Sequence, residues 1–574
     1  MMLKRPFRYY IKKYPRLVLL GTLWLFLTNL MDSLVPMLTG MTIDKIRGDR
    51  PLSEIGEMIG WIFAVIAGLS IFRYLWRIYW ATFHHTVAED LRNRLFDRMS
   101  YLGPSFFRPR KIGQLITLIS NDVNSFRMGI GPGLLVLLDG IFLILLILPQ
   151  MIWISPTWTW QTLVLMPFVP KLVQWVLGQL HGAYHARQAR FADMSGSAQE
   201  IVSGIRVIKS FAQEHHQTQQ FNIHSGAFRS SCNRVAFWDA FFGPALELPV
   251  ALGSVILLLL GTPMVIAGQV TIGQFFAFYQ YIQRMIWPMS AIGIGLGHMQ
   301  EGRASFRRIQ EVLEFEEDVP DSGEVEIAEL KSLEVRDLTF HYPGTVQPAL
   351  DRLSFRINEG ECLGIVGATG SGKSTLIEVL TRQYAVPTGT ILINGISVEK
   401  IKLSSLRRLI GVVPQEAFLF SRKVGENVAL GLDTWKLDDV RDATQCVRLD
   451  REIETWPGAY DALVGERGVN LSGGQKQRLT LARAIICGYP LVILDDALSA
   501  ADAHTEEQIL ERLQGELKKT TSIVVSHRLS AVRGADKILV LRSGSMEAFG
   551  GHPEVLVQST TYRTLAELQD KAAH

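Results

Sequence analysis

Six long apolar stretches constrain the fold of this chain more than any other feature of its sequence. About 20 apolar residues suffice for a helix to cross a bilayer, and a helix satisfies its own backbone hydrogen bonds in lipid. The stretches therefore predict a polytopic α-helical membrane domain with six transmembrane helices. They cover roughly residues 17–39, 57–80, 132–154, 159–181, 240–261 and 271–296.

Composition supports a membrane protein and argues against other classes. Apolar residues make up 48% of the chain, and the mean hydropathy of +0.17 is too high for an ordinary soluble enzyme. The net charge of +3 gives no reason to expect nucleic acid as a partner. The four cysteines are far apart and form no CxxC pair, so neither a zinc site nor a disulfide framework is expected.

The basic residues indicate the orientation in the membrane. Arginine and lysine recur in the long segments 82–130 and 182–236, whereas the short loops 155–158 and 262–270 contain none. By the positive-inside rule both termini are cytoplasmic. The long segments have a helical pattern, so the helices should continue beyond the bilayer. The basic N-terminus lacks a cleavage site and predicts an amphipathic elbow helix on the cytoplasmic face.

Three acidic residues fall within the apolar stretches. An isolated charge at mid-membrane costs about 2.5–3.5 kcal/mol or more, so such residues face a cavity, a partner or water. They can attract a cationic substrate, or they can pair structurally with other helices. Gln283 and Arg284 of the last stretch could hydrogen-bond or pair with these acidic side chains. The candidates for a substrate cavity are Asp32, Asp139, Glu247 and Gln280.

The pattern changes after about residue 300. A long helix ends near Leu313, an acidic segment at 314–330 reads as a linker, and β-rich runs alternate with helical patterns from 331 to 574. This alternation predicts an α/β domain. The expected strands include 352–357, 361–366, 491–494 and 522–525, with a helix at 373–382.

A phosphate-binding loop follows one of these strands and opens the helix. Its glycines let backbone N–H groups wrap phosphates, and the helix N-terminus adds a positive field. Lys373 is expected to reach the β- and γ-phosphates of ATP, and Ser374 to bind Mg²⁺. The loop consists of Gly367, Ala368, Thr369, Gly370, Ser371, Gly372, Lys373 and Ser374, and Thr375 continues it into the helix.

Two aspartates end the strand at 491–495. Asp495 is expected to hold Mg²⁺, and Asp496 stands where a general base would polarise the attacking water. A base must come within about 2.6–3.2 Å of its proton, directly or through one water. Asp is one methylene shorter than Glu, so Asp496 should hydrolyse ATP poorly, unless a small backbone adjustment lets it serve.

Further residues that could contact a nucleotide lie before and after these motifs. Tyr342 precedes the phosphate loop and can stack on adenine, Gln415 can touch Mg²⁺ and water, and His527 can bind the γ-phosphate. About 100 residues after the phosphate loop come Leu471, Ser472, Gly473, Gly474 and Gln475.

Together these residues resemble the nucleotide-binding domain of ABC transporters. In order they match its A-loop, Walker A, Q-loop, signature, Walker B, D-loop and switch histidine. The membrane half is similar to that of six-span ABC exporters. The matching stretches are Tyr342, 367–374, Gln415, 471–475, Asp495–Asp496, Ser499–Asp502 and His527, with 106–122, 201–214 and 273–275 in the membrane half.

The resemblance implies a half-transporter that works as a dimer. Two ATP molecules would bind between two nucleotide domains, each held by one chain's Walker motifs and by the partner's signature. Residues 471–475 and Asp502 would thus act in trans. Segments around 103–113 and 208–216 would be coupling helices, and the long helices would make a domain-swapped contact with the partner.

Departures from the family pattern refine this expectation. Asp496 replaces the usual Glu, as in the degenerate-site subunit of heterodimeric Mdl-type multidrug exporters, while the signature is intact. Ala501 replaces the usual Leu of the D-loop, which leaves the cross-talk between the two sites in question.

The expected function is ATP-driven export of drugs, lipids or other amphipathic molecules across a bacterial inner membrane, by a heterodimer with a second half-transporter. ATP and Mg²⁺ are the expected cofactors, and membrane lipids contact the chain. Two alternatives remain open. The chain could form a homodimeric lipid or drug flippase in which Asp496 is a slow base, or it could be an ATP-gated channel or regulatory subunit without vectorial transport.

Overall fold

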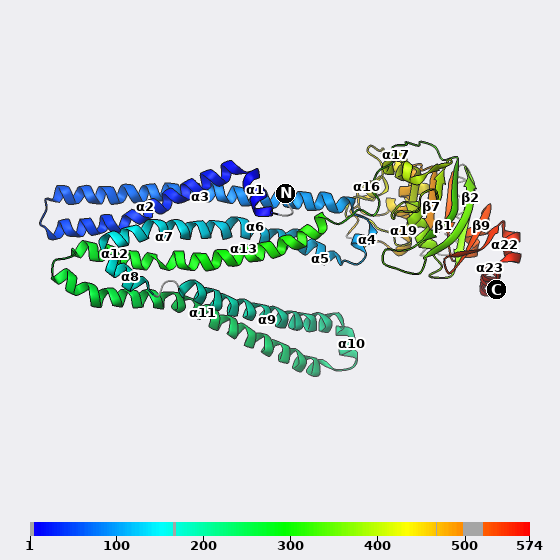
Figure 1. Cartoon of the computed structure of the whole chain (residues 1–574). Helices are drawn as coiled ribbons and strands as arrows, with labels where there is room; N and C mark the ends of the chain where they lie inside the picture. Colours follow the sequence, from blue (N-terminus) through cyan, green and yellow to red (C-terminus); the bar gives the residue numbers. More distant parts are fainter. Residues whose placement is uncertain (1–4, 165–167, 466–467, 498–519, 574) are drawn as a thin grey trace. The chain divides into compact units, whose positions relative to one another are not determined.

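The computed structural model describes residues 5–164, 168–465, 468–497 and 520–573 (Figure 1). The chain forms two compact units: residues 1–101 with 110–315, and residues 102–109 with 316–574. The short segment 102–109 thus belongs to the second unit, although the first unit surrounds it in sequence. Each unit is described by itself.

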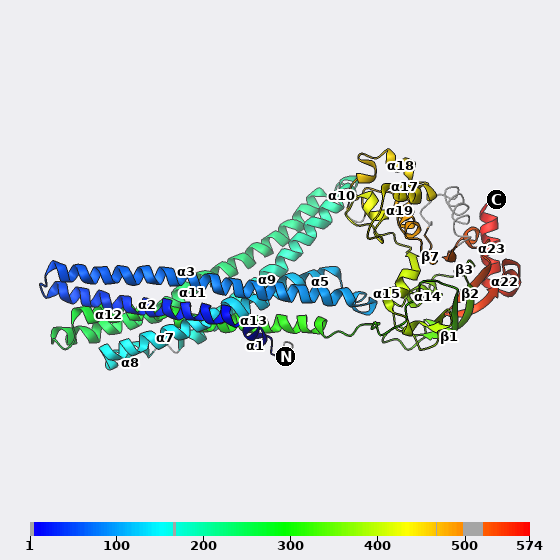
Figure 2. The ribbon, with the colours of Figure 1, turned by 90° about the horizontal axis from the view of Figure 1, so that it is seen from above.

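The described residues of the first unit form helices and no strand. Figures 1 and 2 both show α2 and α3 side by side along most of their length. Two π-helical turns, at Leu118–Asp122 and Gly129–Gly133, join α5, α6 and α7. The helices are α1 Pro6–Lys13, α2 Pro15–Arg47, α3 Leu52–Tyr101, α5 Ile112–Thr117, α6 Val123–Met128, α7 Leu134–Ile154, α8 Pro156–Leu163, α9 Val169–Ser203, α10 Ile205–Ser210, α11 Glu214–Ile266, α12 Ile272–Arg284 and α13 Ile286–Leu313.

Four of the described helical stretches are long and apolar enough to cross a membrane: Pro15–Arg47, Leu52–Tyr101, Ile112–Ile154 and Glu214–Ile266. They contain four of the six predicted spans. The stretch 159–181 falls on α8 and α9, and residues 165–167 between them lie outside the described part of the chain. The stretch 271–296 is divided between α12 and α13. Pro288 lies in the first turn of α13, where its missing N–H costs nothing, so the chain begins a new helix there.

Several helices are longer than a bilayer is thick, as the sequence predicts. Helix α3 has 50 residues and α11 has 53. At about 1.5 Å per residue they are about 75 and 80 Å long, more than twice the ~30 Å of a hydrocarbon core. Helix α11 also continues to Ile266 through Pro263, so the predicted loop at 262–270 is shorter than expected.

The predicted N-terminal elbow is helix α1. It ends in the basic residues Lys12 and Lys13, and Tyr10 is fully buried. The Lys13 ammonium lies 2.6 Å from the Asp90 carboxylate of α3, and Arg94 donates a hydrogen bond of 3.1 Å to the Tyr9 hydroxyl. Helix α1 is therefore tied to α3 by charged and polar contacts.

A close approach of two glycines joins α2 to α12. A Cβ atom on Gly40 would lie 2.4 Å from the carbonyl oxygen of Gly273, so a side chain here would push the helices apart. The Asp44 carboxylate accepts hydrogen bonds from the Gly273 N–H (2.7 Å) and the Thr271 hydroxyl (2.5 Å). It thereby caps the start of α12.

The second unit contains the α/β domain that the sequence predicts. One sheet is antiparallel, with the order β2-β1-β4-β5. The other has the order β10-β9-β3-β8-β7-β6, and its strands from β9 to β6 are parallel. The strands are β1 Ser332–Phe340, β2 Leu350–Asn358, β3 Cys362–Gly367, β4 Ile391–Ile393, β5 Ile396–Ser397, β6 Ile410–Val413, β7 Leu491–Asp495, β8 Thr521–Val525, β9 Lys537–Arg542 and β10 Ser545–Gly550.

Two hydrophobic cores cover the faces of the six-stranded sheet. Alternate residues of β7 face opposite sides: Ile493 packs in the core that includes the antiparallel sheet and α14, whereas Leu494 packs with α17 and α19. The helices are α4 Pro104–Phe107, α14 Lys373–Leu380, α15 Leu403–Leu409, α16 Val424–Val428, α17 Leu437–Cys446, α18 Asp450–Glu454, α19 Gly473–Ile486, α21 Leu529–Val532, α22 His552–Gln558 and α23 Thr560–Ala573.

The parallel strands gather polar residues at one edge. Strands β3, β8, β7 and β6 are neighbours in that order, and Val525 is paired with both Ile365 and Asp495. The carboxyl ends of parallel strands meet at the same edge of a sheet, which is where ligands bind in α/β folds. Residues that immediately follow these four strands therefore share one site.

Candidate functional site

The phosphate loop has the backbone geometry of an anion cradle. Gly370 and Gly372 adopt left-handed φ values of +79° and +102°. A Cβ on Gly372 would lie 2.9 Å from Leu350 Cδ2, and one on Gly367 would lie 2.4 Å from the Leu541 carbonyl oxygen. Only glycine fits these positions, so the loop wraps tightly between β3 and the start of α14. The geometry fits the phosphates of a nucleotide.

Lys373, the first residue of α14, turns back over this loop. Its ammonium donates to the carbonyl oxygens of Gly367 (2.7 Å) and Ala368 (3.0 Å). Burial lowers the pKa of Lys373, and the negative charges of Asp495 and Asp496 oppose that effect. One cation and two carboxylates thus act on one another beside the loop.

Asp495 ends β7 and interacts electrostatically with the Lys373 ammonium. Burial raises the pKa of its carboxyl, and the neighbouring Asp496 raises it further, whereas Lys373 lowers it. A divalent cation beside Asp495 would offset both effects. Within the described ranges no group of three or more His, Cys, Asp and Glu side chains could hold a metal. A magnesium ion here would complete its shell with the Ser374 hydroxyl, nucleotide oxygens and water.

Asp496 has a different partner. Its two carboxylate oxygens each lie 2.9 Å from Nδ1 of His527. Asp496 also has a left-handed φ of +50°, and its N–H donates to the Val525 carbonyl (2.8 Å). An ionised carboxylate only accepts hydrogen bonds, so Nδ1 of His527 carries the proton. Nε2 of His527 can then donate to a γ-phosphate oxygen only if it too carries a proton, because phosphate oxygens accept hydrogen bonds.

The remaining predicted residues of this edge are more exposed. Gln415 lies two residues after β6 and is exposed, as is Ser374. Thr375 is buried, and its hydroxyl lies 2.9 Å from that of Tyr342. Thr369 lies in the turn between β3 and α14. The D-loop at 499–502, including Asp502, lies outside the described residues.

The signature residues form the start of α19. Ser472 is the N-cap: its hydroxyl accepts from the Gln475 N–H (3.2 Å), and its own N–H donates to the Gln475 side chain (2.9 Å). Glu452 of α18 accepts from Gln475 (3.0 Å) and pairs with Arg478 (2.7 Å). Leu471 packs against the core beneath. Gly473 and Gly474 form the first turn of a helix whose N-terminus is held rigidly.

Tyr342 is fixed from several sides. Its hydroxyl donates to Glu378 of α14 (3.0 Å), and its ring meets those of Phe340 and Tyr384 edge-on. Glu378 and its ion-pair partner Arg108 were not identified from the sequence. Glu378 could have been identified from the sequence, because it lies in the predicted helix that directly follows the phosphate loop. Nothing in the sequence joins Arg108 to this site.

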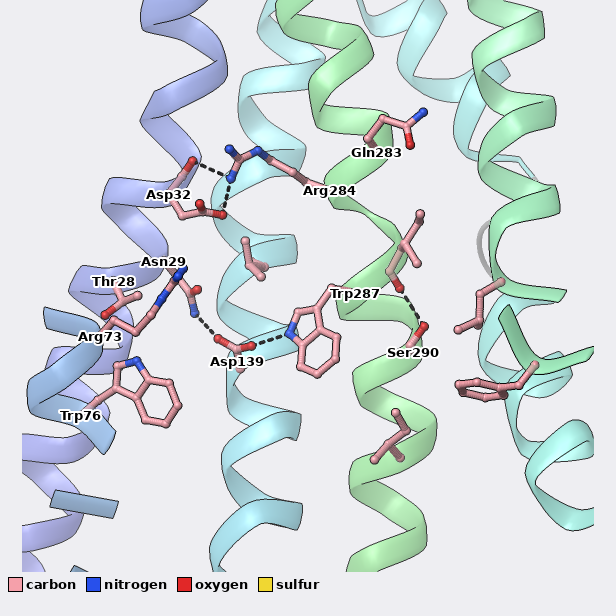
Figure 3. A pocket seen from close by; sticks show the side chains of 15 residues that line it. Thr28, Asn29, Asp32, Arg73, Trp76, Asp139, Gln283, Arg284, Trp287 and Ser290 are labelled. Atoms are coloured by element: carbon pink, nitrogen blue, oxygen red, sulfur yellow. Dashed lines mark hydrogen bonds and ion pairs between the residues drawn. The ribbon is translucent and has the colours of Figure 1, made fainter. Parts of the chain in front are cut away.

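A cavity of about 410 Å³ lies among the helices of the first unit (Figure 3). Asp32 pairs there with Arg284, whose guanidinium also donates to the Asp32 carbonyl (3.1 Å). Asp139 accepts from Asn29 (2.8 Å) and from the Trp287 indole (2.5 Å). The cavity lining comprises Thr28, Asn29, Asp32, Arg73, Trp76, Asp139, Leu143, Phe242, Leu246, Gln283, Arg284, Ile286, Trp287, Ser290 and Ile294.

The cavity includes two of the four substrate candidates. Asp32 and Asp139 line it, whereas Glu247 is exposed on α11 and Gln280 is half-buried on α12, and neither is part of its lining. Among the described residues no cation lies within ion-pair distance of Asp139, and Arg73, a cation that lines the same cavity, forms no ion pair with any of them. Asn29 and Trp287 could not be identified from sequence alone, because each becomes relevant only through helix packing.

Comparisons with known proteins agree with this architecture. The model of the ABC transporter transmembrane region matches residues 18–289, and that of the ABC transporter domain matches 350–499. The probable multidrug resistance ABC transporter ATP-binding/permease protein YheI of Bacillus subtilis is 32% identical over 564 residues, 98% of this chain and 96% of that protein. The multidrug resistance-like ATP-binding protein MdlA of Escherichia coli is 33% identical over 562 residues, 96% of this chain and 94% of that protein.

A solved structure has the same fold. It is a bacterial Atm1-family ABC exporter with ATP bound, and it superposes with a TM-score of 0.78 at 22% identity, over 97% of this chain and 98% of that chain. A helical membrane domain followed by an α/β nucleotide domain is the architecture of membrane proteins that use ATP. This chain belongs to the ABC transporter family.

Membership of the ABC transporter family establishes the general activity of the chain. The chain is an exporter half-transporter, and its ABC domain binds and hydrolyses ATP and couples hydrolysis to transport. It is a multi-pass membrane protein, and half-transporters of this kind dimerise.

Proposed function

We propose that this chain is one half of a heterodimeric exporter of amphipathic molecules, and that its own Walker site binds ATP but hydrolyses it slowly. The observation that carries the proposal is the environment of Asp496. Its side chain is one methylene shorter than that of Glu, and both of its oxygens lie against His527. A carboxylate in this position is poorly placed to polarise a water beside the γ-phosphate.

The loop 367–374 and α14 would hold the nucleotide. The loop N–H groups and Lys373 would bind the phosphates, Tyr342 would stack on adenine, and Ser374, Asp495 and Gln415 would hold Mg²⁺. The magnesium ion would supply a counter-charge for the phosphates. His527 and Gln415 would then position the γ-phosphate and water, while Asp496 serves as a weak base.

The intact signature would serve the partner. The start of α19 presents the Ser472 hydroxyl, two glycine N–H groups and a helix N-terminus, which together favour an anion. In a dimer this surface, with Asp502, would complete the partner's ATP site. Closure of the two nucleotide domains on ATP would turn the membrane cavity outward, and hydrolysis, mainly at the partner's site, would reset it.

The cavity of the membrane domain supports an amphipathic cargo. Its volume of about 410 Å³ fits a drug-sized molecule, and Trp76, Phe242 and Trp287 provide apolar surface. Asp139 supplies a negative charge without a cationic partner, which favours a cargo with a basic group. The relatives YheI and MdlA are named as multidrug resistance proteins, and a drug-like cargo agrees with those names.

The same cavity allows a test of the cargo. Replacement Asp139→Asn should lower transport of a lipophilic cation into inside-out vesicles by about fivefold, the effect of about 1 kcal/mol, and should leave a neutral dye unaffected. Glu247→Gln is the matched control because Glu247 lies outside the cavity lining. Equal losses for the cation and the neutral dye would refute the role of Asp139.

We place the chain in a bacterial inner membrane with both termini and the nucleotide domain in the cytoplasm. The distribution of basic residues supports this topology, since segments 82–130 and 182–236 are rich in Arg and Lys and the short loops lack them. Labelling of single cysteines at 155–158 and in 208–216 from the outside would test it, because only the former should react.

ATP hydrolysis by the purified chain tests the central proposal. The native chain alone should be nearly silent, and Asp496→Glu should raise its turnover at least tenfold, because a positioned base contributes about 10²–10⁴-fold. Asp496→Asn is the control and should stay silent. Brisk hydrolysis by the native chain would show that Asp496 is a working base and would favour a homodimer.

A further inference from the structure

The short segment 102–109 connects α3 to α5, yet it packs entirely within the nucleotide unit. Phe106 is fully buried there. The Asp318 carboxylate accepts a hydrogen bond from the Ser105 N–H (2.9 Å) and so caps the start of α4. A Cβ on Gly103 would lie 2.3 Å from the same carboxylate oxygen, so the contact requires glycine. The segment is therefore held in a defined position.

Arg108 at the end of this segment reaches the rings beside the phosphate-loop helix. Its guanidinium carbon lies over the Tyr342 ring, 5.1 Å from the centroid, and 5.6 Å from the centroid of Tyr384. Both distances are within the range of cation–π attraction. The guanidinium also forms an ion pair with Glu378.

Glu378 links this contact to the nucleotide site. One of its carboxylate oxygens binds Arg108, and the other accepts the Tyr342 hydroxyl at 3.0 Å. The same hydroxyl lies 2.9 Å from that of Thr375, two residues after Lys373. Tyr342 is thus held at its hydroxyl by α14, at its edge by Tyr384 and over its ring by Arg108.

We propose that Arg108 is a positioning residue for adenine: it sets the orientation of the Tyr342 ring, so that recognition of the base depends on segment 102–109. The inference rests on the proposed role of Tyr342 as the adenine-stacking residue. Arg108 acts through that ring and through Glu378 and takes no part in the chemistry.

Equilibrium binding of two probes tests the proposal. The probes are ATP and inorganic triphosphate, which lacks the base. The protein is the full-length chain, assembled as its dimer in nanodiscs. If the partner is a different chain, its Walker lysine is replaced so that only the site of this chain binds nucleotide. Arg108→Ala should weaken ATP binding about threefold to tenfold, the range expected for one aromatic–cation contact, and should leave triphosphate binding unchanged. Arg108→Lys should fall in between, because lysine keeps the charge but loses the planar guanidinium.

Matched variants separate this role from a structural one. Arg110→Ala is the control, since Arg110 lies over Phe315, 5.2 Å from its centroid, and should bind ATP normally. Tyr342→Ala should weaken ATP but not triphosphate, and in that background Arg108→Ala should add nothing.

Each contrary result has a distinct meaning. Equal weakening of ATP and triphosphate by Arg108→Ala would show that Arg108 only supports α14, and tighter ATP binding would show that it obstructs the base. Either would overturn the inference while the role of Tyr342 stands. If Tyr342→Ala left the preference for ATP over triphosphate unchanged, the proposed role of Tyr342 would itself fail.

Discussion

Two adjacent aspartates at the end of β7 have different partners and therefore different chemistry. Asp495 interacts with Lys373, which lowers the pKa that burial and Asp496 raise. Both carboxylate oxygens of Asp496 lie 2.9 Å from Nδ1 of His527. Asp496 has a left-handed backbone, a conformation that aspartate tolerates better than most residues. Two adjacent carboxylates thus have different neighbours, which agrees with the proposed roles of Asp495 as a metal ligand and Asp496 as a weak base.

Gly372 has a left-handed backbone and no space for a side chain, so its replacement tests the role of the phosphate loop. Gly372→Ala should abolish ATP binding, because φ is +102° and the added Cβ would lie 2.9 Å from Leu350 Cδ2 and 3.0 Å from the Ala349 carbonyl oxygen. Gly389→Ala is the matched control: its φ is +80°, but nothing lies within 4 Å. It should cost only the backbone strain, about 1–2 kcal/mol, and should bind ATP. Binding of a fluorescent ATP analogue and thermal melting separate the two; normal binding by Gly372→Ala would contradict the cradle.

Residues whose role follows from local pattern are predictable from sequence, and residues defined by distant contacts are not. The loop 367–374 has a strand before it and a helix after it, so its geometry could be anticipated. Arg108 meets Glu378 across 270 positions of sequence, and no periodicity reports such a pairing. Asp32 and Arg284 are an intermediate case, because opposite charges within apolar stretches must find partners.

At the scale of elements, the C-terminal helices depend on one carboxylate. Glu547 of β10 accepts hydrogen bonds from the Thr561 N–H (3.1 Å) and hydroxyl (2.6 Å) and from the Ser559 hydroxyl (2.9 Å), at the start of α23. Burial opposes ionisation, but these hydrogen bonds prevail and lower the pKa of Glu547 to about 2. The carboxylate thus acts as an N-cap supplied by another element.

This cap predicts an acid-sensitive helix. Because the folded pKa of Glu547 is about 2 and the usual value is 4.5, its contribution is complete above about pH 4.5 and is lost as the pH falls toward 2. At pH 7, Glu547→Gln should destabilise α23 by about 1–2 kcal/mol, and it should reduce the loss of stability between pH 5 and pH 3. Hydrogen exchange of residues 560–569 measures both effects. Glu567→Gln, an exposed change on the same helix, is the control and should alter neither.

Element boundaries in the membrane half show where sequence reasoning fails. Apolar character is continuous through 271–296, so it predicts one span, yet the structure divides it at Met285 between α12 and α13. Pro288 was the available signal. Pro249 and Pro263, by contrast, lie inside α11 without ending it. Proline alone therefore does not decide whether a helix stops, because neighbouring helices can satisfy the freed carbonyl groups.

At the scale of the whole molecule, the proposed function implies that one chain carries unequal halves of two ATP sites. Its Walker motifs have a shortened base, and its signature at the start of α19 is capped by Ser472 and anchored through Gln475 to Glu452. Slow hydrolysis at its own site, together with efficient ATP turnover by the assembled transporter, would require a partner with a competent base and hence an asymmetric dimer. In a homodimer both sites would combine the same weak base with the same sound signature.

This asymmetry leads to unequal effects of two substitutions in the assembled transporter. Ser472→Arg should lower ATP turnover of the dimer at least tenfold, because the added bulk would block the signature surface that completes the partner's competent site. Lys373→Ala should lower turnover only about twofold to threefold, since it removes nucleotide from a site that contributes little hydrolysis. Steady-state phosphate release from the purified dimer measures both. If the two substitutions cause equal losses, the sites are equivalent, the asymmetric mechanism is wrong, and Asp496 must be a base as effective as the partner's.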